Sequence, residues 1–218
     1  MVDVLIYRMD PARIDKEAIK RAAAALRQGK LVIFPTETVY GLAANAFDAA
    51  AAARVFAAKQ RPLTEALPVQ VGDKRDMKKV AESVPELAQR LIDRFFPGPL
   101  TLVLAKHVNV PEIVTANGPK IAVRMPSHPV ALALLWEFGC PIIATSANIS
   151  GGLEPQAAAD ALAQIGEAVE VVLDAGPAPL GQVSTVVDVT ESPPRILRMG
   201  ALPVEEIADV VGEVLEQW

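Results

Sequence analysis

Short apolar runs recur along the whole chain, and prolines, glycines and helical stretches separate them. The 18 prolines punctuate these runs, as where Pro35 ends the run Leu31-Val32-Ile33-Phe34. Runs of this length are typical of buried strands, which are stable only beside other strands and under a covering layer. The chain therefore has to fold around a sheet.

The apolar periodicity predicts strands and helices in irregular order. Strands are expected at residues 4–7, 31–34, 67–71, 100–105, 121–124, 141–145, 169–173, 185–189 and 195–198. Helices are expected at residues 15–28, 48–58, 86–95, 129–138, 156–164 and 203–217. Because strands and helices do not alternate strictly, we predict an α+β or open α/β fold, a twisted mixed sheet with flanking helices.

Several expected helices begin after a side chain that can accept hydrogen bonds from the free N–H groups of the first turn. Asp15 and Asp48 precede two helices, and Ser83 with Glu86 has the spacing of a capping box before a third. In the apolar helix 129–138, we expect Trp136 to lie in the core.

Composition and charge restrict the possible partners. Hydrophobic residues make up 51% of the 218 residues, enough for a large core, and no repeat or long linker divides the chain, so we expect one domain over residues 1–218. The most apolar long stretch, Val130–Ala144, is too short and too interrupted to span a membrane. The formal net charge of -5 argues against a surface that holds nucleic acid by general positive charge. It favours a small anionic ligand met by a few clustered cations.

Other familiar chemistries lack their motifs. The single cysteine, Cys140, and the absence of a leader-like segment at the start predict a reducing, cytoplasmic location, and Cys140 is expected to be an inert core residue. No Cys/His spacing predicts a metal site. Neither a P-loop nor a G-x-S-x-G elbow is present. His128, just before Pro129, is more simply a helix-start residue than a base.

Polar side chains gather directly after the run that ends at Phe34. Thr36, Glu37, Thr38 and Tyr40 follow it within a few residues and can hydrogen-bond a polar ligand. A tight turn whose threonines cap their own backbone explains the same residues equally well.

Two further segments can hold phosphate. Lys59 and Arg61, at the end of a helix, combine a point charge with a planar fork, although cations there also simply counter the helix dipole. Ser146 and Asn148 lie in a glycine-bearing loop before a helix, a geometry that suits phosphate but is also that of an ordinary turn. Isolated polar residues near other strands are Arg124, Ser184 and Arg198.

In this order, the segments resemble the YrdC/Sua5 family. Residues 34–42 (FPTETVYGL) are similar to the N-terminal signature of that family, Lys59-Gln60-Arg61 to its K-x-R element and Ser146-Ala147-Asn148 to its S-x-N element. Arg124 and residues 184–188 and 198–200 also fall where the family pattern has residues. The resemblance spans about residues 10 to 200; each motif is weak alone, whereas their joint order and spacing are specific.

The resemblance implies a YrdC/RibB-like fold with a concave ligand cavity, in the short single-domain form. It implies a threonylcarbamoyl-AMP synthase, which joins L-threonine, bicarbonate or CO2, and ATP into threonylcarbamoyl-AMP and pyrophosphate. Downstream tRNA threonylcarbamoyl transferase proteins then use the product for the t6A modification of tRNA. Mg2+ is expected to enter with the phosphates of ATP, because the sequence offers no carboxylate cage.

The resemblance also implies residue roles. Lys59 and Arg61 are the expected catalytic residues, since they would neutralise the triphosphate and the charge that develops on it. The residues expected to bind the nucleotide are Lys59, Arg61, Ser146, Asn148, Arg198 and Glu65. The residues expected to bind threonine are Thr36, Thr38, Tyr40, Gln70, Arg124 and Ser184.

Three positions depart from the family pattern. Gln70 replaces a frequent histidine, and Glu65 and Glu154 stand where neutral polar residues are usual. A carboxylate beside a triphosphate is repulsive unless a cation intervenes, so we expect Glu65 to pair with Arg61, with a shared magnesium as the alternative. The departures keep two other functions open. One is a YciO-like paralogue, or a relative of the hydrogenase-maturation carbamoyltransferases, that acts on another carbamoyl compound. The other is a non-catalytic RNA-binding module.

Overall fold

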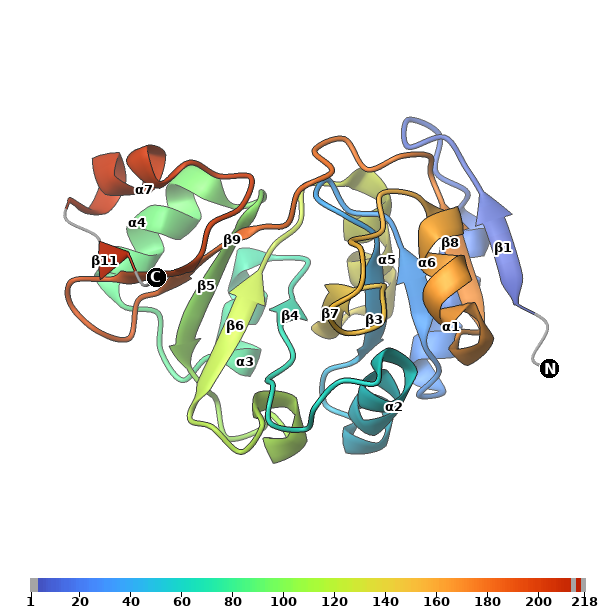
Figure 1. Ribbon diagram of the computed structural model, residues 1–218, viewed down its shortest axis with the longest axis horizontal. Helices are drawn as coiled ribbons and strands as arrows, with labels where there is room; N and C mark the ends of the chain where they lie inside the picture. Colours follow the sequence, from blue (N-terminus) through green and yellow to red (C-terminus); the bar gives the residue numbers. More distant parts are fainter. Residues whose placement is uncertain (1–3, 213–214, 217–218) are drawn as a thin grey trace.

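The structure, a computed structural model, describes residues 4–212 and 215–216. The strands of this part form one sheet in the order β1-β8-β2-β3-β7-β4-β6-β5-β9-β10-β11, which extends across the molecule in Figure 1. Parallel pairs such as β2 with β8 and antiparallel pairs such as β3 with β7 both occur, which confirms the predicted mixed sheet. The strands are β1 (Leu5–Arg8), β2 (Val32–Phe34), β3 (Gly41–Asn45), β4 (Val69–Gln70), β5 (Leu100–Ala105), β6 (Lys120–Arg124), β7 (Ile142–Ser146), β8 (Val171–Asp174), β9 (Thr185–Asp188), β10 (Arg195–Arg198) and β11 (Leu215–Glu216).

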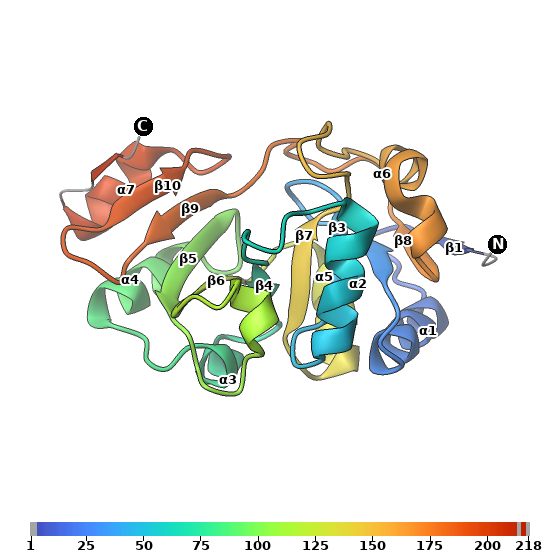
Figure 2. The same cartoon turned by 60° about the horizontal axis from the view of Figure 1, so that its bottom comes forward.

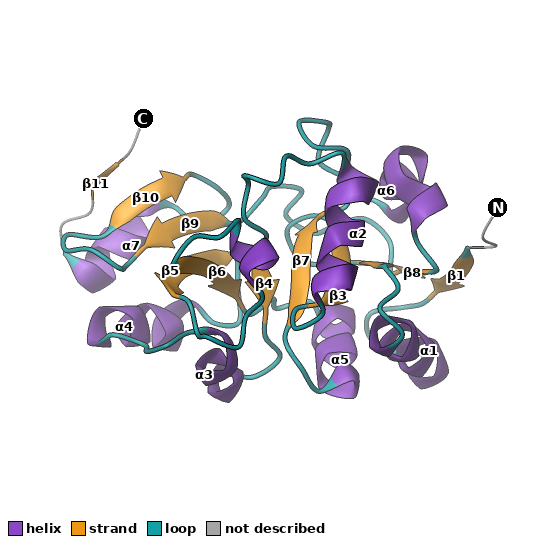
Figure 3. Ribbon diagram, turned by 90° about the horizontal axis from the view of Figure 1, so that it is seen from below, coloured by secondary structure: helices purple, strands orange, loops and turns teal. Residues whose placement is uncertain are grey.

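Helices cover both faces of the sheet. The α-helices are α1 (Lys16–Arg27), α2 (Ala49–Lys59), α3 (Met77–Val80), α4 (Glu86–Phe95), α5 (Pro129–Phe138), α6 (Ala158–Ile165) and α7 (Val204–Val211), and the 3-10 helices are η1 (Lys74–Asp76), η2 (Glu112–Thr115) and η3 (Gly166–Ala168). Figure 3 shows α1 and α5 on one face of the half that contains β3 and β7, with α2 and α6 on the other. At the other end of the sheet, α4 and α7 pack together near β5, β9 and β10 (Figure 2).

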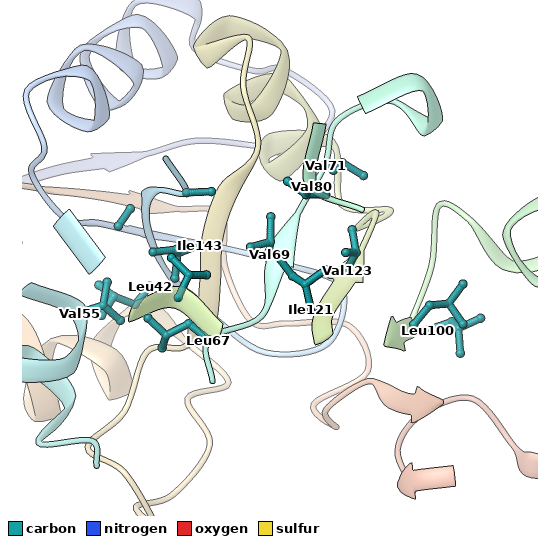
Figure 4. Close-up of a cluster of buried hydrophobic side chains, with 14 of the residues drawn as sticks. Leu42, Val55, Leu67, Val69, Val71, Val80, Leu100, Ile121, Val123 and Ile143 are labelled. Atoms are coloured by element: carbon teal, nitrogen blue, oxygen red, sulfur yellow. The ribbon is translucent and has the colours of Figure 1, made fainter. Parts of the chain in front are cut away.

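Successive side chains along the buried strands contribute alternately to two hydrophobic clusters. In β2, Val32 and Phe34 join the cluster under α1 and α5, whereas Ile33 joins the larger cluster on the opposite face. This is the period-two pattern of a strand with both faces covered. Figure 4 shows the larger cluster, in which Leu42 and Val55 lie close together. No helix in the described part of the chain is long and apolar enough to cross a membrane.

Two of the expected helix caps are present and one is not. The Asp15 carboxylate accepts hydrogen bonds from the N–H groups of residues 17 and 18, at 2.9 and 3.1 Å, and Asp48 caps α2 in the same way. The capping box of Ser83 and Glu86 is wrong: Pro85 occupies the N-cap position of α4 and no side chain caps it. Because the residue before a proline disfavours the helical conformation, the helix cannot begin early enough for Ser83 to cap it.

Two of the differences from the sequence prediction have a clear physical reason. Strand β3, with the sequence Gly41-Leu-Ala-Ala-Asn, was not predicted because it has no β-branched residue. Its glycine is required: a Cβ at Gly41 would lie 2.7 Å from the ring of Phe34 on β2. The helix predicted over 203–217 is too long, because α7 ends at Gly212, which has a φ of 83°, and residues 215–216 pair with β10 instead. The final predicted position, Gln217, lies outside the described residues.

Three predictions about single residues can also be compared with the structure. His128 is the N-cap of α5, where its Nδ1 accepts a hydrogen bond from the N–H of Val130 at 3.2 Å, as predicted. The prediction that Trp136 lies in the core is wrong, because the residue is 63% exposed. Its indole N–H donates to the carbonyl of Gly72 at 2.7 Å, so only one edge of the ring is held against the protein. Cys140, expected in the core, is a half-buried free thiol.

Candidate functional site

A cavity of about 510 Å³ lies along the concave face of the sheet, and segments far apart in the sequence line it. Its walls include every residue that the sequence analysis assigned to a site: Thr36, Thr38, Tyr40, Lys59, Arg61, Glu65, Gln70, Arg124, Ser146, Asn148, Ser184 and Arg198. Glu154, the other unusual acid, also lines it. The fold thus brings together hydroxyl groups, amides and four cationic side chains that the sequence separates by up to 162 positions (198 − 36 = 162).

The loop between β2 and β3 supplies a directed chain of hydroxyl groups. The Thr36 hydroxyl donates to the carbonyl of Val39 at 2.6 Å and lies 2.8 Å from the Thr38 hydroxyl. Because the single hydrogen of Thr36 is used, Thr38 is the donor in that pair. The oxygen of Thr38 in turn accepts from Nη1 of Arg124 at 2.8 Å. The threonines therefore cap their own turn, as one interpretation of this loop predicted, and they also orient the arginine, whereas ligand binding by this loop stays a prediction.

Arg124, at the end of β6, is a buried arginine with a buried acid beside it. Its Nη2 lies 2.7 Å from a carboxylate oxygen of Glu37, and Arg124 and Glu37 are 6% and 7% exposed. Burial lowers the pKa of His128, and the negative charge of Glu37 opposes this shift. The sequence predicted Glu37 only as one of the polar residues after Phe34 that can hydrogen-bond a ligand, and its ion pair with Arg124, across 87 residues (124 − 37 = 87), leaves no local signal.

Lys59, the last residue of α2, lines the cavity but is almost completely buried. It is 1% exposed, and its ammonium donates to the carbonyls of Ser146 and Asn148 at 2.5 and 2.7 Å and to Oδ1 of Asn148 at 2.9 Å. Burial, and to a lesser degree the charge of Arg61, lowers the pKa of Lys59 to about 8. The three hydrogens of its ammonium thus already have acceptors in the protein, and its predicted contact with a phosphate stays a prediction.

The loop after β7 is folded around that ammonium. The Ser146 hydroxyl donates to Oδ1 of Asn148 at 2.8 Å, and the amide nitrogen of Asn148 donates to the carbonyl of Gly152 at 2.8 Å. The N–H of Ser150 donates to the backbone carbonyl of Lys59, also at 2.8 Å. Residue 59 thus holds the loop through both its side chain and its backbone.

Arg61 is held by the segment that follows it. Its Nε and Nη2 donate to the carbonyls of Glu65 and Ala66 at 3.1 and 3.0 Å, and its Nη1 lies 3.4 Å from the Glu65 carboxylate. The predicted ion pair between Glu65 and Arg61 is confirmed. Burial lowers the pKa of Arg61, and the charge of Glu65 opposes that shift. The negative charge of the exposed Glu154 raises the pKa of Lys59 and so opposes the effect of burial there.

Arg198 and Ser184, which both line the cavity, contact each other. Both Nε and Nη2 of Arg198 donate to the carbonyl of Ser184, at 3.1 and 2.9 Å, and Nη2 also donates to its hydroxyl at 3.1 Å. The Ser184 hydroxyl lies 2.8 Å from that of Thr101 on β5, a cavity residue that the sequence analysis missed. Gly200 allows this contact, since a Cβ there would lie 2.4 Å from the backbone of Ser184. Burial lowers the pKa of Arg198, and the charge of Arg124 lowers it further.

Tyr40 and Gln70 differ in what they leave free. The Tyr40 hydroxyl donates to the carbonyl of Gly176 at 2.6 Å and accepts from the N–H of Ala175 at 3.1 Å, so it is already engaged away from a ligand. Gln70 is 5% exposed, lines the cavity and has a side-chain oxygen with no hydrogen-bond partner in the structure. A buried acceptor without a partner is costly, so Gln70 is ready to accept from a bound molecule.

Within the residues that the structure describes, no group of three or more His, Cys, Asp or Glu side chains could hold a metal ion. The cavity offers cations and hydrogen-bond donors instead. Such a set binds carboxylates and phosphates and stabilises negative charge that develops on them.

Comparisons with known proteins agree on one family. The family model Sua5_yciO_yrdC, described as telomere recombination, matches residues 24–200. A Pyrococcus abyssi protein named threonylcarbamoyl-AMP synthase is 46% identical over 202 residues, which are 93% of this chain and 59% of that protein. A Bacillus subtilis protein of the same name is 41% identical over 197 residues, 90% of this chain and 57% of that protein.

A solved structure gives the same result. It is described as P. abyssi Sua5 complexed with L-threonine, and it superposes on 98% of this chain with a TM-score of 0.94 and 44% sequence identity. This chain covers 62% of that one. The chain thus spans somewhat less than two thirds of the length of these relatives.

Proposed function

The chain belongs to the Sua5/YciO/YrdC family, as its motifs predicted, and from this premise we propose that it is an L-threonylcarbamoyladenylate synthase. The reaction would join L-threonine, bicarbonate or CO2, and ATP into threonylcarbamoyl-AMP and pyrophosphate. The expectation of one domain over residues 1–218 is part of this proposal.

The observation that carries the proposal is the composition of the cavity described above. One part of its wall has Arg124 with the threonine hydroxyls, which suits the carboxylate and ammonium groups of an amino acid. Another part has Arg61, Arg198 and the loop around Asn148, which suits a nucleotide triphosphate. Two anionic substrates can therefore meet in one cavity that neutralises both.

The proposed reaction requires correctly positioned substrates more than it requires a general base. Threonine that has taken up CO2 on its nitrogen carries a carbamate, and a carbamate oxygen is already an anionic nucleophile. It would form a bond to the α-phosphorus of ATP while the bond from that phosphorus to the pyrophosphate oxygen breaks. Bringing two anions together is the main difficulty, and fixed cations reduce it. In this proposal Arg61 and Arg198 face the phosphates, and Lys59 acts by shaping the loop of Ser146 and Asn148.

The remaining parts of the proposal follow from the reaction. Mg2+ would arrive with the phosphates of ATP. Downstream transferase proteins would move the threonylcarbamoyl group to tRNA, in the cytoplasm. Thr36, Thr38, Gln70 and Ser184 would contact threonine, with Tyr40 supplying its ring rather than its engaged hydroxyl.

Pyrophosphate release from ATP tests the proposal. We expect release only when L-threonine, bicarbonate and Mg2+ are all present, with each omitted in turn. Release that does not depend on threonine would contradict the synthase and favour a paralogue that uses another carbamoyl compound. No release under any condition, together with binding to RNA, would favour the non-catalytic module.

A further inference from the structure

The guanidinium of Arg124 is held on three sides. Nε donates to the carbonyl of Gly98 at 3.1 Å, Nη1 donates to the hydroxyl of Thr38 at 2.8 Å, and Nη2 lies 2.7 Å from the carboxylate of Glu37. A guanidinium has five N–H groups. The two hydrogen bonds use one N–H of Nε and one of Nη1, whereas Nη2 is buried without a hydrogen-bond partner and is held by the charge of Glu37. At least one N–H therefore remains on each terminal nitrogen, on a residue that lines the cavity.

Glu37 lies behind this arginine and not on the cavity wall. Its side chain is 10% exposed, and Arg124 is the cation with which it forms an ion pair. The backbone carbonyl of Glu37 accepts from the N–H of Leu180 at 2.9 Å, so the residue is fixed at both ends. A buried acid that touches a cavity arginine but not the cavity can act on a ligand only through that arginine.

The direction of the hydrogen bonds extends from Arg124 into the loop. Arg124 donates to Thr38, Thr38 donates to Thr36, and Thr36 donates to the carbonyl of Val39. The hydroxyl hydrogen of Thr38 is therefore used, and what Thr38 can still offer is a lone pair. The pair of Arg124 and Thr38 thus presents two donors and one acceptor.

We propose that Glu37 is a positioning residue for the amino-acid substrate, which holds Arg124 so that two guanidinium N–H groups and the acceptor of Thr38 match a zwitterion. The carboxylate of an α-amino acid would take the two donors, and its ammonium would donate to Thr38. This inference rests on the proposed function, because it takes an amino acid to be the ligand.

The charge of Glu37 has a second consequence. It offsets the charge of Arg124 while the cavity is empty, so that an arginine that is 6% exposed is not left as an uncompensated buried charge. A neutral pair suits a ligand of zero net charge, such as an amino-acid zwitterion, better than a dianion. Threonine itself, rather than its carbamate, is then the species that enters this part of the cavity.

The test compares ligand binding by calorimetry in the full chain and in the variants Glu37→Gln, Glu37→Asp and Arg124→Gln. L-Threonine and ATP are titrated separately. We expect Glu37→Gln to raise the Kd for L-threonine about tenfold or more, since the buried charge that holds the guanidinium is lost, and to leave the Kd for ATP within about twofold. Glu37→Asp, which keeps the charge but is one methylene shorter, should give an intermediate increase. Glu191→Gln, which removes a surface ion pair with Arg195 at 3.4 Å, is the matched control and should change neither Kd.

The double variant decides whether Glu37 acts through Arg124. In the Arg124→Gln background, which carries no guanidinium to hold, Glu37→Gln should cause no further loss of threonine binding. Additive losses, equal losses for ATP and threonine, or an unchanged threonine Kd in Glu37→Gln would each overturn the inference. If Glu37→Gln does not fold, a wild-type threonine Kd in Glu37→Asp overturns it as well. Failure of the unaltered chain to bind L-threonine would instead refute the proposed function, and the inference with it.

Discussion

Replacing Lys59 by methionine should change the protein mainly through the loop at residues 146–150. The ammonium of Lys59 donates to three oxygens of Ser146 and Asn148, and the substitution removes all three donors while it keeps a similar chain length. If Lys59 instead served as a free phosphate contact, the loop would be unaffected.

The magnitude follows from two opposing effects. Oδ1 of Asn148 still accepts a hydrogen bond from the Ser146 hydroxyl, but the backbone carbonyls of Ser146 and Asn148 each lose a donor. Each loss costs about 1–3 kcal/mol of stability. Against this, the protein no longer buries an ammonium. The fall of the Lys59 pKa from 10.5 to about 8 puts that burial at about 3 kcal/mol. The two losses together are about 2–6 kcal/mol, so the net change in the free energy of unfolding should lie between a gain of about 1 kcal/mol and a loss of about 3 kcal/mol.

Two measurements check this account. Denaturant unfolding gives the stability of Lys59→Met, with the exposed Lys20→Met as the control, which should stay within about 0.5 kcal/mol of the unaltered protein. Hydrogen exchange should show faster exchange of the Ser150 amide, which donates to the carbonyl of Lys59.

A double-mutant cycle with Asn148→Ala isolates the contact itself. The ammonium–amide hydrogen bond predicts a coupling of about 1.5–3 kcal/mol in stability, and of similar size in kcat/KM for ATP, because the two residues act as one unit. A coupling below about 0.5 kcal/mol, with unchanged exchange of the Ser150 amide, would refute the reasoning and return Lys59 to a direct phosphate contact.

Four further predictions concern the same segment. Glu65→Asn should leave the free energy of unfolding within about 0.5 kcal/mol of the unaltered protein and the magnesium requirement unchanged. Two backbone carbonyls still hold Arg61 in this variant, and the ion pair that it loses is half exposed. A several-fold rise in the magnesium concentration needed for half-maximal pyrophosphate release would point to a shared ion. Gln60→Gly should raise the free energy of unfolding by up to about 1 kcal/mol in a denaturant titration. Gln60 has a φ of 50°, a left-handed conformation that glycine adopts without steric cost. A clear loss of stability would contradict this. Pyrophosphate release should fall as the pH rises through about 8, where Lys59 loses a proton, and a flat profile up to pH 9.5 or so would count against that assignment. The contribution of Lys59 to stability should instead rise between pH 8 and 10.5, because there the unfolded chain binds the proton and the folded chain does not.

Local patterns were sufficient for much of the fold. Helices with an Asp before them, such as α1 after Asp15, began where the cap predicted, because capping depends on neighbours in the chain. Strand β3 was missed because it owes its conformation to burial between β2 and β7 rather than to β-favouring residues. Trp136 was misplaced because an apolar helix that covers only one face of the sheet leaves some of its large residues toward solvent.

The site was predicted in its members but not in their contacts. The order of the motifs identified residues such as Arg61 and Arg124, and all of those named share one cavity. Their contacts depend on segments that approach only in the folded chain. Lys59 meets a loop 87 residues away, and Arg124 meets an acid equally distant. Thr101 was missed for the same reason, since a single hydroxyl in an apolar strand gives no signal until Ser184 lies beside it.

The arrangement of these contacts explains how four cationic side chains can share one cavity. Like charges lower one another's pKa here, as Arg61 does for Lys59 and Arg124 does for Arg198. Each cation therefore has oxygen partners of its own in the protein, which are carboxylates for Arg124 and Arg61 and mainly backbone carbonyls for the other two. Because these partners fix the cations before any ligand arrives, a bound anion meets donors that are already oriented and need little reorganisation. The same partners limit how strongly the empty cavity attracts anions, so ligand selection depends on matching the remaining donors and acceptors rather than on net charge.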